Sequence, residues 1–366
     1  MTMPRPIIIA AGGTGGHFFP AEALAAALLA QGERVVLLTD ARSGALNSPV
    51  FAQTEKHVLA GAGLAGRSLQ RAAKGALSLA QGAKQAYALL RRLQPKAIVA
   101  FGGYPSVPPV IAASLLGQRK PFIVLHEQNA VLGRANRFLQ RFVDLLALNF
   151  AHTQRLSGKI KTITVGNPVR PAIAALSGQG YTAPVQKIEL LILGGSLGAK
   201  VFSSLVPQAL ALLPEGLRAR LHVTQQCRAD DLEVAKASLQ QSGIEAELSP
   251  FFQDVAGLLK AAHLVISRAG ASSVAEIAVA GRPALFIPLP NAIDDHQRAN
   301  ADALAQAGGA LRLDQAGLTA SLFAEKIETL LMNPEKLEKM AAACASQGEA
   351  KAALRLAELV LQGARS

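Results

Sequence analysis

Three side chains that can take up a proton lie at the end of an apolar stretch of the chain or shortly after one. His17 follows the glycine run GGTGG, and His126 and Glu127 end the stretch FIVLHE. An imidazole changes its charge near working pH, so it can accept a proton from a hydroxyl, as a carboxylate can. We take His17 as the first candidate for a general base, with Glu127 and His126 as alternates or as its orienting partners. A histidine at this place can also serve only to hydrogen-bond a substrate.

The glycine run before His17 lies within PIIIAAGGTGGHFFP, which predicts a buried strand, a turn and then a helix that Pro20 opens. Such a turn brings backbone N–H groups to a phosphate at a helix N-terminus. The pattern recurs in IELLILGGSLGAKVF, residues 188–202. This weak internal repeat predicts two Rossmann-like domains of α/β class, each with a glycine turn behind its first strand, that face each other across a cleft.

Neither glycine turn matches a common nucleotide fingerprint. Counted from Gly13, the third glycine of GxGxxG would fall on Phe18, although Asp40 ends the second predicted strand as a ribose-binding acid does. The pattern GxxxxGK[ST] is absent from the sequence. The turns are therefore typical of phosphate binding without NAD or ATP hydrolysis, and a merely structural tight turn remains open.

A third phosphate candidate is SRAGASSVAE, residues 267–276. Ser272 and Ser273 are suited to cap a helix whose exposed N–H groups would hold a diphosphate. Glu276 follows within one turn, where its carboxylate can accept hydrogen bonds from two ribose hydroxyls. The alternative is a capping box between Ser273 and Glu276, because their spacing is S-x-x-E.

Strand and helix patterns alternate along the chain, which predicts parallel doubly wound sheets. Proline and glycine mark a boundary near Gly166–Gly180. We expect one domain over 1–165 and a second over 166–344. The C-terminal helix, about 345–366, is expected to pack back on the first domain.

Composition limits the class of protein. Half of the 366 residues are hydrophobic and 17% are charged, as in a globular chain. The two cysteines, Cys227 and Cys344, fit a reducing compartment, and no secretory leader opens the sequence. The uncharged run Ala97–Gln118 is long enough to span a bilayer, but glycines and prolines interrupt it, so we expect a strand, a loop and a short helix.

The positive charge is confined to one half of the chain. Residues 1–165 carry 19 Lys+Arg and 6 Asp+Glu, whereas the remainder carries 18 and 19. An anionic membrane surface fits this asymmetry, and the helical pattern of Arg67–Leu93 is basic and amphipathic. With 4% aromatic residues and no reading motif, nucleic acid is not expected as a partner. A basic face that only keeps the protein soluble remains open.

Seven motifs occur in the order found in the MurG glycosyltransferases: AGGTGGHFFP, FGGYP, HEQN, GNPVR, GGSLGAK, SRAGASSVAE and DDHQRANA. The chain resembles that family over nearly its full length. The resemblance implies a GT-B fold, with an acceptor- and membrane-binding domain over 1–165 and a UDP-sugar-binding domain over 166–344. It also implies an inverting, metal-independent transferase with no cofactor. Its substrates would be UDP-N-acetylglucosamine and undecaprenyl-diphospho-N-acetylmuramoyl-pentapeptide, in peptidoglycan synthesis and cell-wall biogenesis. It also implies a peripheral location at the cytoplasmic face of the inner membrane, and cell-wall or division proteins as partners.

The resemblance also implies a role for individual residues. The acceptor would meet Gly13, Gly102, Gly103 and Tyr104. The donor sugar and its diphosphate would meet Thr14, Gly15, Gly16, Asn129, Ser196 and Gln297, and Arg170 would contact the nucleotide near the hinge. Uracil would be read partly by the backbone at Phe252, and phosphate and ribose would be held by Ala271, Ser272, Ser273, Val274, Ala275 and Glu276. Leu197 and Ala275 replace Gln and Ser of some relatives, which leaves only backbone contacts at those two positions.

Two other classes of function stay open from the residues alone. The first is another GT-B enzyme, such as a glycolipid glycosyltransferase or a UDP-sugar 2-epimerase. The second is a non-catalytic UDP-sugar-binding scaffold of the division machinery. Retention of His17, Glu127 and Glu276 argues against the scaffold. Asp230–Asp231 and Asp294–Asp295 are interpreted as helix-start acids, so no metal site is expected.

Overall fold

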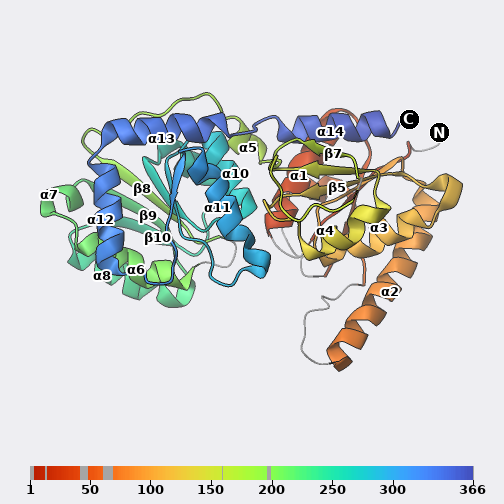
Figure 1. The fold of residues 1–366 in the computed structure, drawn as a ribbon, viewed down its shortest axis with the longest axis horizontal. Coiled ribbons are helices and arrows are strands. Elements are labelled where there is room, and N and C mark those ends of the chain that lie inside the picture. The colour runs from red at the N-terminus through yellow and green to blue at the C-terminus, as the bar shows by residue number, and fades with distance from the viewer. Residues whose placement is uncertain are drawn as a thin grey trace. The chain divides into compact units, whose positions relative to one another are not determined.

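The computed structural model describes residues 4–12, 15–41, 48–60, 69–158, 160–195 and 199–365. Within 69–158, side chains are described from residue 74 onward. The chain divides into two compact units, Met1–Arg170 with Lys351–Ser366 (unit 1) and Pro171–Ala350 (unit 2). Each unit is an α/β layer structure with one parallel sheet (Figure 1).

Unit 1 is built on a seven-stranded sheet in the order β3-β2-β1-β4-β5-β6-β7. The interior strand β1 pairs in parallel with β2 on one side and β4 on the other, so that Ile7 lies opposite both Val35 and Ala97. The strands are β1 (Ile7–Ala10), β2 (Val35–Thr39), β3 (Glu55–Val58), β4 (Ala97–Ala100), β5 (Phe122–Glu127), β6 (Leu145–Leu148) and β7 (Thr162–Thr164).

Helices cover both faces of this sheet, because its central strands are apolar on both sides. Ile7 and Ile9 face a layer that includes Leu24 of one helix and Leu356 of the last helix of the chain. The opposite face, with Ile8, packs on the second and third helices. The helices are α1 (Gly15–Ala30), α2 (Leu69–Leu93), α3 (Val107–Ser114), α4 (Arg134–Leu139) and α14 (Ala352–Gly363), with 3-10 turns at Phe51–Gln53, Tyr104–Ser106, Gly117–Arg119 and Gln140–Phe142.

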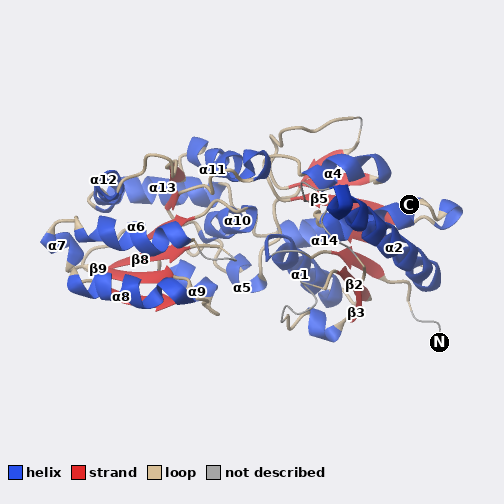
Figure 2. Cartoon of the chain, turned by 90° about the horizontal axis from the view of Figure 1, so that it is seen from below, coloured by secondary structure: helices blue, strands red, loops and turns tan. Residues whose placement is uncertain are grey.

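Helix α1 differs from its prediction, because it begins at Gly15 and carries Pro20 in its interior. The expectation that Pro20 opens this helix is therefore wrong. Pro20 is the sixth residue of α1, just beyond the first four N–H groups that have no partner inside a helix, so it costs the helix one hydrogen bond. Helix α1 packs on the sheet beside α14, which itself contacts β4 and β5, and α1 is apolar nearly all round (Figure 2).

Unit 2 repeats the design with a six-stranded parallel sheet in the order β10-β9-β8-β11-β12-β13. Its strands are β8 (Ile188–Leu193), β9 (Leu221–Gln226), β10 (Glu245–Ser249), β11 (Leu264–Ser267), β12 (Ala284–Phe286) and β13 (Ala310–Arg312). Its helices are α5 (Pro171–Ala174), α6 (Lys200–Ala211), α7 (Glu215–Arg218), α8 (Leu232–Gln241), α9 (Val255–Ala261), α10 (Ala271–Ala280), α11 (His296–Gln306), α12 (Ala320–Leu331) and α13 (Pro334–Ser346), with 3-10 turns at Ala229–Asp231 and Ile293–Asp295.

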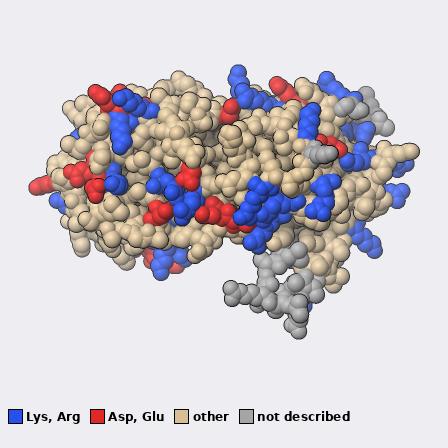
Figure 3. Space-filling model, viewed as in Figure 1, with Lys and Arg blue, Asp and Glu red and all other residues tan. Residues whose placement is uncertain are grey.

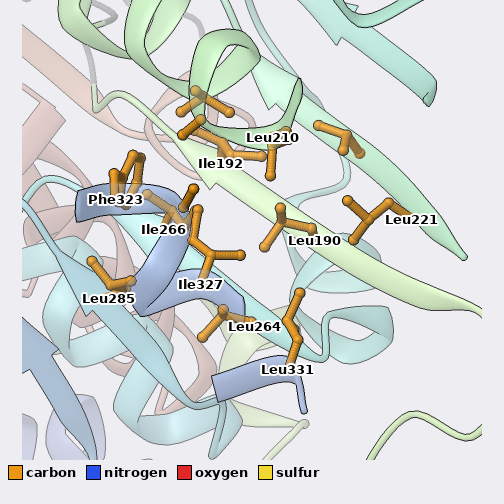
Figure 4. Close-up of a cluster of buried hydrophobic side chains, with 14 of the residues drawn as sticks. Leu190, Ile192, Leu210, Leu221, Leu264, Ile266, Leu285, Phe323, Ile327 and Leu331 are labelled. Atoms are coloured by element: carbon orange, nitrogen blue, oxygen red, sulfur yellow. The ribbon is translucent and has the colours of Figure 1, made fainter. Parts of the chain in front are cut away.

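The core of unit 2 joins the sheet to α6 and α12. Leu190 and Leu264 on the strands contact the layer that holds Phe323 and Ile327 of α12, and all four side chains are buried (Figure 4). This packing holds β8 and β11 side by side, and both strands lead into predicted phosphate loops.

The apolar run Ala97–Gln118 folds as β4, a 3-10 turn and α3, as the sequence predicts. Among the helices that the structure describes, none is both long enough and apolar enough to cross a bilayer.

Candidate active site

In unit 1 strands β1 and β4 are neighbours, and the strands that follow them in the chain lie on opposite sides: β2 next to β1, and β5 next to β4. The loops behind such a pair border the crevice where open α/β sheets bind ligands. His17 is the third residue of α1, behind β1, and Gly103 lies behind β4. A Cβ atom placed on Gly103 would lie 3.5 Å from Nε2 of His17. The structure thus brings the predicted base next to a predicted acceptor loop.

The loop behind β4 depends on its glycines. Gly102 and Gly103 have φ values of +84° and +69°, which side-chain-bearing residues rarely adopt. A Cβ atom on Gly102 would also lie 3.0 Å from Oδ1 of Asn136. Ser106 donates its hydroxyl to the Gly102 carbonyl at 2.8 Å and so closes the turn. Tyr104, partly exposed, begins the 3-10 turn.

Glu127, which ends β5, is only 1% exposed, and four hydrogen bonds occupy its carboxylate. Oε1 accepts from the backbone N–H of Asn129 at 2.9 Å and from its side-chain amide at 3.0 Å. Oε2 accepts from Gly133 N and from Asn136 Nδ2, both at 2.8 Å. This arrangement favours the orienting role for Glu127, because its lone pairs already fix the HEQN turn.

His126 is fully buried and packs against the ring of Phe101, with ring centroids 5.3 Å apart. Its Nε2–H donates to the Gly166 carbonyl at 3.0 Å. Burial lowers the pKa of His126 to about 4, so the ring is neutral at physiological pH. His126 therefore ties the HEQN segment to the GNPVR segment, which also favours an orienting role.

Gln128 was not among the residues predicted for the site. Its side chain is 1% exposed and contacts His17, with 3.1 Å between Nδ1 of the ring and Oε1 of the amide. Its Nε2 donates to the Phe101 carbonyl at 2.8 Å. Only its place in HEQN, directly behind a strand, could have pointed to it.

Four described residues predicted to contact the donor lie in unit 1. Asn129 is partly exposed, and its backbone and side-chain N–H groups both reach Glu127. The guanidinium of Arg170, partly exposed, lies 5.2 Å from the centroid of the Phe19 ring. Gly15 and Gly16 begin α1. Gly13, Thr14 and Ser196 lie outside the described residues.

In unit 2 the corresponding neighbours are β8 and β11, at the point where the strand order reverses. The loop behind β8 begins with Gly194 and Gly195, and Gly195 has a φ of +79°. Gln226, at the end of β9, accepts the Gly194 N–H at 3.2 Å and donates to the Pro250 carbonyl at 3.2 Å. This amide holds the start of the second glycine turn against the loop behind β10.

Helix α10 starts differently from its prediction. Its N-cap is Gly270, with φ and ψ of −63° and 142° and no side-chain cap, so Ser272 and Ser273 lie inside the first turn. The expectation that these serines cap the helix is wrong, and the same geometry excludes the capping box with Glu276. The N-terminal N–H groups of α10 point out of the end of the helix, which is the arrangement that binds anions. Glu276, partly exposed, follows in the second turn.

The buried side chain of Arg268 stabilises the turn before α10. Its side chain is 7% exposed and donates to the carbonyls of Ile287 at 2.8 Å and Pro288 at 3.0 Å, and to Oε1 of Gln315 at 2.8 Å. Burial lowers the pKa of the guanidinium, and no ion pair to it is found among the described residues. Asn300, fully buried, donates to the Ala269 carbonyl at 3.0 Å. Neither residue was predicted for the site, because their partners lie far away in the chain and most of them are backbone atoms.

The remaining predicted donor contacts also follow strand ends of unit 2. Phe252, partly exposed, stands in the loop behind β10. Gln297, in the first turn of α11, accepts the Leu289 N–H through Oε1 at 2.9 Å, which leaves its Nε2 to donate. The candidate residues of each unit therefore lie at one edge of its sheet, the carboxyl end of parallel strands.

Within the described residues, no three His, Cys, Asp or Glu side chains are grouped to hold a metal ion.

Comparison with known proteins agrees with this arrangement. Models of the glycosyltransferase family 28 N-terminal and C-terminal domains match residues 7–147 and 189–356. A curated relative from Granulibacter bethesdensis is 56% identical over 98% of this chain and 94% of its own length. One from Acidiphilium cryptum is 55% identical over 98% and 97%. Both are named UDP-N-acetylglucosamine–N-acetylmuramyl-(pentapeptide) pyrophosphoryl-undecaprenol N-acetylglucosamine transferase.

Among solved structures, MurG of Acinetobacter baumannii matches 98% of this chain and 100% of its own, with 30% identity and a TM-score of 0.78. This match confirms the expected GT-B fold. UDP-GlcNAc 2-epimerase of Neisseria meningitidis has a TM-score of 0.67 at 13% identity, so it shares the fold alone. The chain belongs to glycosyltransferase family 28 and, within it, to the MurG family of N-acetylglucosaminyltransferases.

Proposed function

We propose that the chain transfers N-acetylglucosamine from UDP-N-acetylglucosamine to the 4-hydroxyl of undecaprenyl-diphospho-N-acetylmuramoyl-pentapeptide. The 56% identity to the Granulibacter transferase, over nearly the whole of both chains, is the observation that carries this proposal. The buried hydrogen bonds around Glu127 and Arg268 add support, because they hold the loops that would bind acceptor and donor.

The reaction is a single displacement. The 4-hydroxyl oxygen bonds to the anomeric carbon, the bond from that carbon to the diphosphate oxygen breaks, and UDP leaves with the electron pair. The linkage changes from α to β. His17 takes the hydroxyl proton, while the N-termini of α6 and α10 stabilise the charge that develops on the diphosphate. Glu276 accepts hydrogen bonds from the ribose hydroxyls, and Gln297 donates to the sugar.

We assign the acceptor to the loop of Gly102, Gly103 and Tyr104 in unit 1. The Gly103 backbone runs beside Nε2 of His17, so a sugar hydroxyl held there meets the base. Without side chains, the two glycines let a lipid diphosphate approach the backbone closely, and a side chain at either position would be strained.

We also propose that unit 1 binds the anionic cytoplasmic face of the inner membrane, where a lipid-linked acceptor resides. Leu77, Leu115 and Phe138 are 72%, 66% and 45% exposed. The guanidinium of Arg141 lies 5.4 Å from the centroid of the Phe138 ring. Figure 3 shows mainly lysine and arginine over unit 1 and mixed signs over unit 2. Binding to phosphatidylglycerol vesicles should fall with added salt and be weak on phosphatidylcholine. Equal binding to both lipids would contradict the proposal.

The direct test of the function is UDP release from UDP-N-acetylglucosamine, with and without the lipid-linked muramoyl-pentapeptide, followed by analysis of the products. We expect release that requires the acceptor and a product with a β-linked N-acetylglucosamine. Epimerisation of the donor without acceptor would identify a 2-epimerase. Donor binding without turnover would indicate the scaffold.

A further inference from the structure

We propose that Gln128 is a positioning residue that fixes the tautomer of His17, with the proton on Nδ1 and the lone pair of Nε2 open to the acceptor hydroxyl. The inference rests on the proposed role of His17 as the base. It assigns a task to a residue that lies in the HEQN motif but was given no role there.

The orientation of the Gln128 amide follows from its neighbours. The Phe101 carbonyl can only accept, and it lies 2.8 Å from Nε2 of Gln128, so the amide nitrogen must face it. A flipped amide would set two oxygens against each other. At 1% exposure no bulk water would relieve that contact.

The amide orientation then determines which nitrogen of His17 carries the proton. Oε1 of Gln128 has no hydrogen to give, so Nδ1 of His17, 3.1 Å away, must donate. A neutral imidazole carries one N–H, and the hydrogen bond at one nitrogen selects the tautomer. Nε2 is therefore left as the acceptor that a general base needs.

Space beside Nε2 is kept by the acceptor loop. Gly103 lies beside the Cδ2–Nε2 edge of the His17 ring, and a Cβ atom on Gly103 would lie 3.5 Å from Nε2. Among the described residues, Gln128 alone hydrogen-bonds the His17 ring. A sugar hydroxyl held by the Gly103 loop would thus meet a lone pair and not an N–H.

The backbone around Gln128 is itself held in place. Gln128 directly follows β5, and Asn149, just behind β6, donates from its side chain to the Gln128 carbonyl at 2.8 Å. Phe101 directly follows β4, which pairs with β5. The ends of three adjacent strands therefore set the position of the amide, and rigid elements place a catalytic group better than free loops do.

The proton balance is simple. Nε2 of His17 takes the hydroxyl proton as the oxygen bonds to the anomeric carbon and UDP leaves with the electron pair. The resulting imidazolium still donates from Nδ1 to Oε1 of Gln128, which stabilises the charge on the ring. Gln128 neither gains nor loses a proton.

The test compares Gln128→Met with Gln128→Glu and with a matched control, Gln140→Met. Gln140 is another buried glutamine of unit 1, which donates to the Arg137 carbonyl at 3.1 Å and to Ser157 at 2.6 Å, and it contacts none of the candidate residues. Methionine removes the acceptor at Nδ1 with little change in volume. In Gln128→Glu a protonated carboxyl can donate its O–H to the Phe101 carbonyl and keep its other oxygen towards His17. Thermal unfolding of each variant reports whether the fold persists.

The first readout is the protonation of each ring nitrogen in two-bond proton–nitrogen spectra of histidine-labelled protein, with His17→Gln to assign the signal. We expect a proton on Nδ1 in the wild type, Gln128→Glu and Gln140→Met, and a shift towards Nε2–H in Gln128→Met. The second readout is kinetic: kcat of Gln128→Met should fall at least about tenfold, with the KM for UDP-N-acetylglucosamine unchanged.

An Nε2–H tautomer in the wild type, or an unchanged tautomer and kcat in Gln128→Met, would overturn the proposal. If Gln128→Met does not fold, the wild-type spectrum together with Gln128→Glu decides the question. A wild type that transfers no sugar would instead overturn the proposed function, and the spectra would still decide the tautomer.

Discussion

Asn136 donates its side-chain N–H to the Glu127 carboxylate at 2.8 Å, from the first turn of a helix that begins seven residues beyond the end of β5. With the N–H groups of Asn129 and Gly133, it surrounds a carboxylate that is 1% exposed. The turn that carries Gln128 is thus folded around the Glu127 carboxylate. The role of Glu127 in HEQN is therefore to shape this turn, and the role of general base is assigned to His17.

Glu127→Gln should lower the stability of unit 1 by about 2–3 kcal/mol, because an amide nitrogen would face groups that themselves donate. Native-state hydrogen exchange of the β5 amides measures this free energy for unit 1 by itself.

Glu55→Gln is the matched control for this substitution. Glu55 pairs with Arg34 at 2.7 Å, with its side chain 35% exposed, so its loss should cost about 1 kcal/mol or less. Equal effects of the two substitutions would show that the Glu127 network does not stabilise the turn.

Arg268→Lys should weaken binding of UDP-N-acetylglucosamine at least about tenfold and destabilise unit 2 by about 2 kcal/mol. A lysine ammonium is a point donor and cannot serve two carbonyls and the Gln315 amide together. Calorimetric titration with the donor and hydrogen exchange in β11 are the measurements.

Arg220→Lys provides the comparison for Arg268. Arg220 also donates to two carbonyls, those of Gln186 at 2.8 Å and Val185 at 3.0 Å, but it is accessible to solvent and lies before β9, at the opposite edge of the sheet. Donor affinity should be unchanged in this variant. A similar loss in both would refute a specific role for Arg268 in holding the donor loops.

The buried ring of His126 should make the stability of unit 1 depend on pH. Its folded pKa is about 4 and its ordinary value is 6.5, so between these values the unfolded chain binds the additional proton. Stability is therefore fully present above pH 6.5 and falls as the pH drops towards 4, by up to about 3 kcal/mol.

His126→Gln isolates this contribution. The difference in free energy of unfolding between wild type and variant, from hydrogen exchange in β5, should shrink as the pH falls from 7 to 4. A difference that stays constant over that range would contradict the neutral, buried state of His126.

The sequence predicted the parts of the site that local patterns encode. An apolar run followed by GGTGG specifies a strand and a phosphate-type turn, and parallel alternation then places Gly102 and Glu127 at the same edge of the sheet. The GT-B fold and the MurG family followed from seven motifs in order, and the comparisons confirmed both.

What the sequence could not predict are contacts between side chains and distant backbone. The Arg268 partners lie 19 and 20 residues away, and the Gln128 partner Phe101 lies 27 residues away on a neighbouring strand. The N-cap of α10 at Gly270 instead of a serine was not predicted, because glycine and serine are both common at N-caps. Pro20 was read as a helix start because the first turn tolerates proline, which leaves the boundary undetermined.

Transfer by His17→Ala is the measurement that tests the central claim most directly. With UDP-N-acetylglucosamine saturating and the lipid-linked acceptor present, we expect kcat to fall by at least about a hundredfold while donor affinity stays at the wild-type value. Near-normal turnover of this variant would contradict the assignment of His17 as the base.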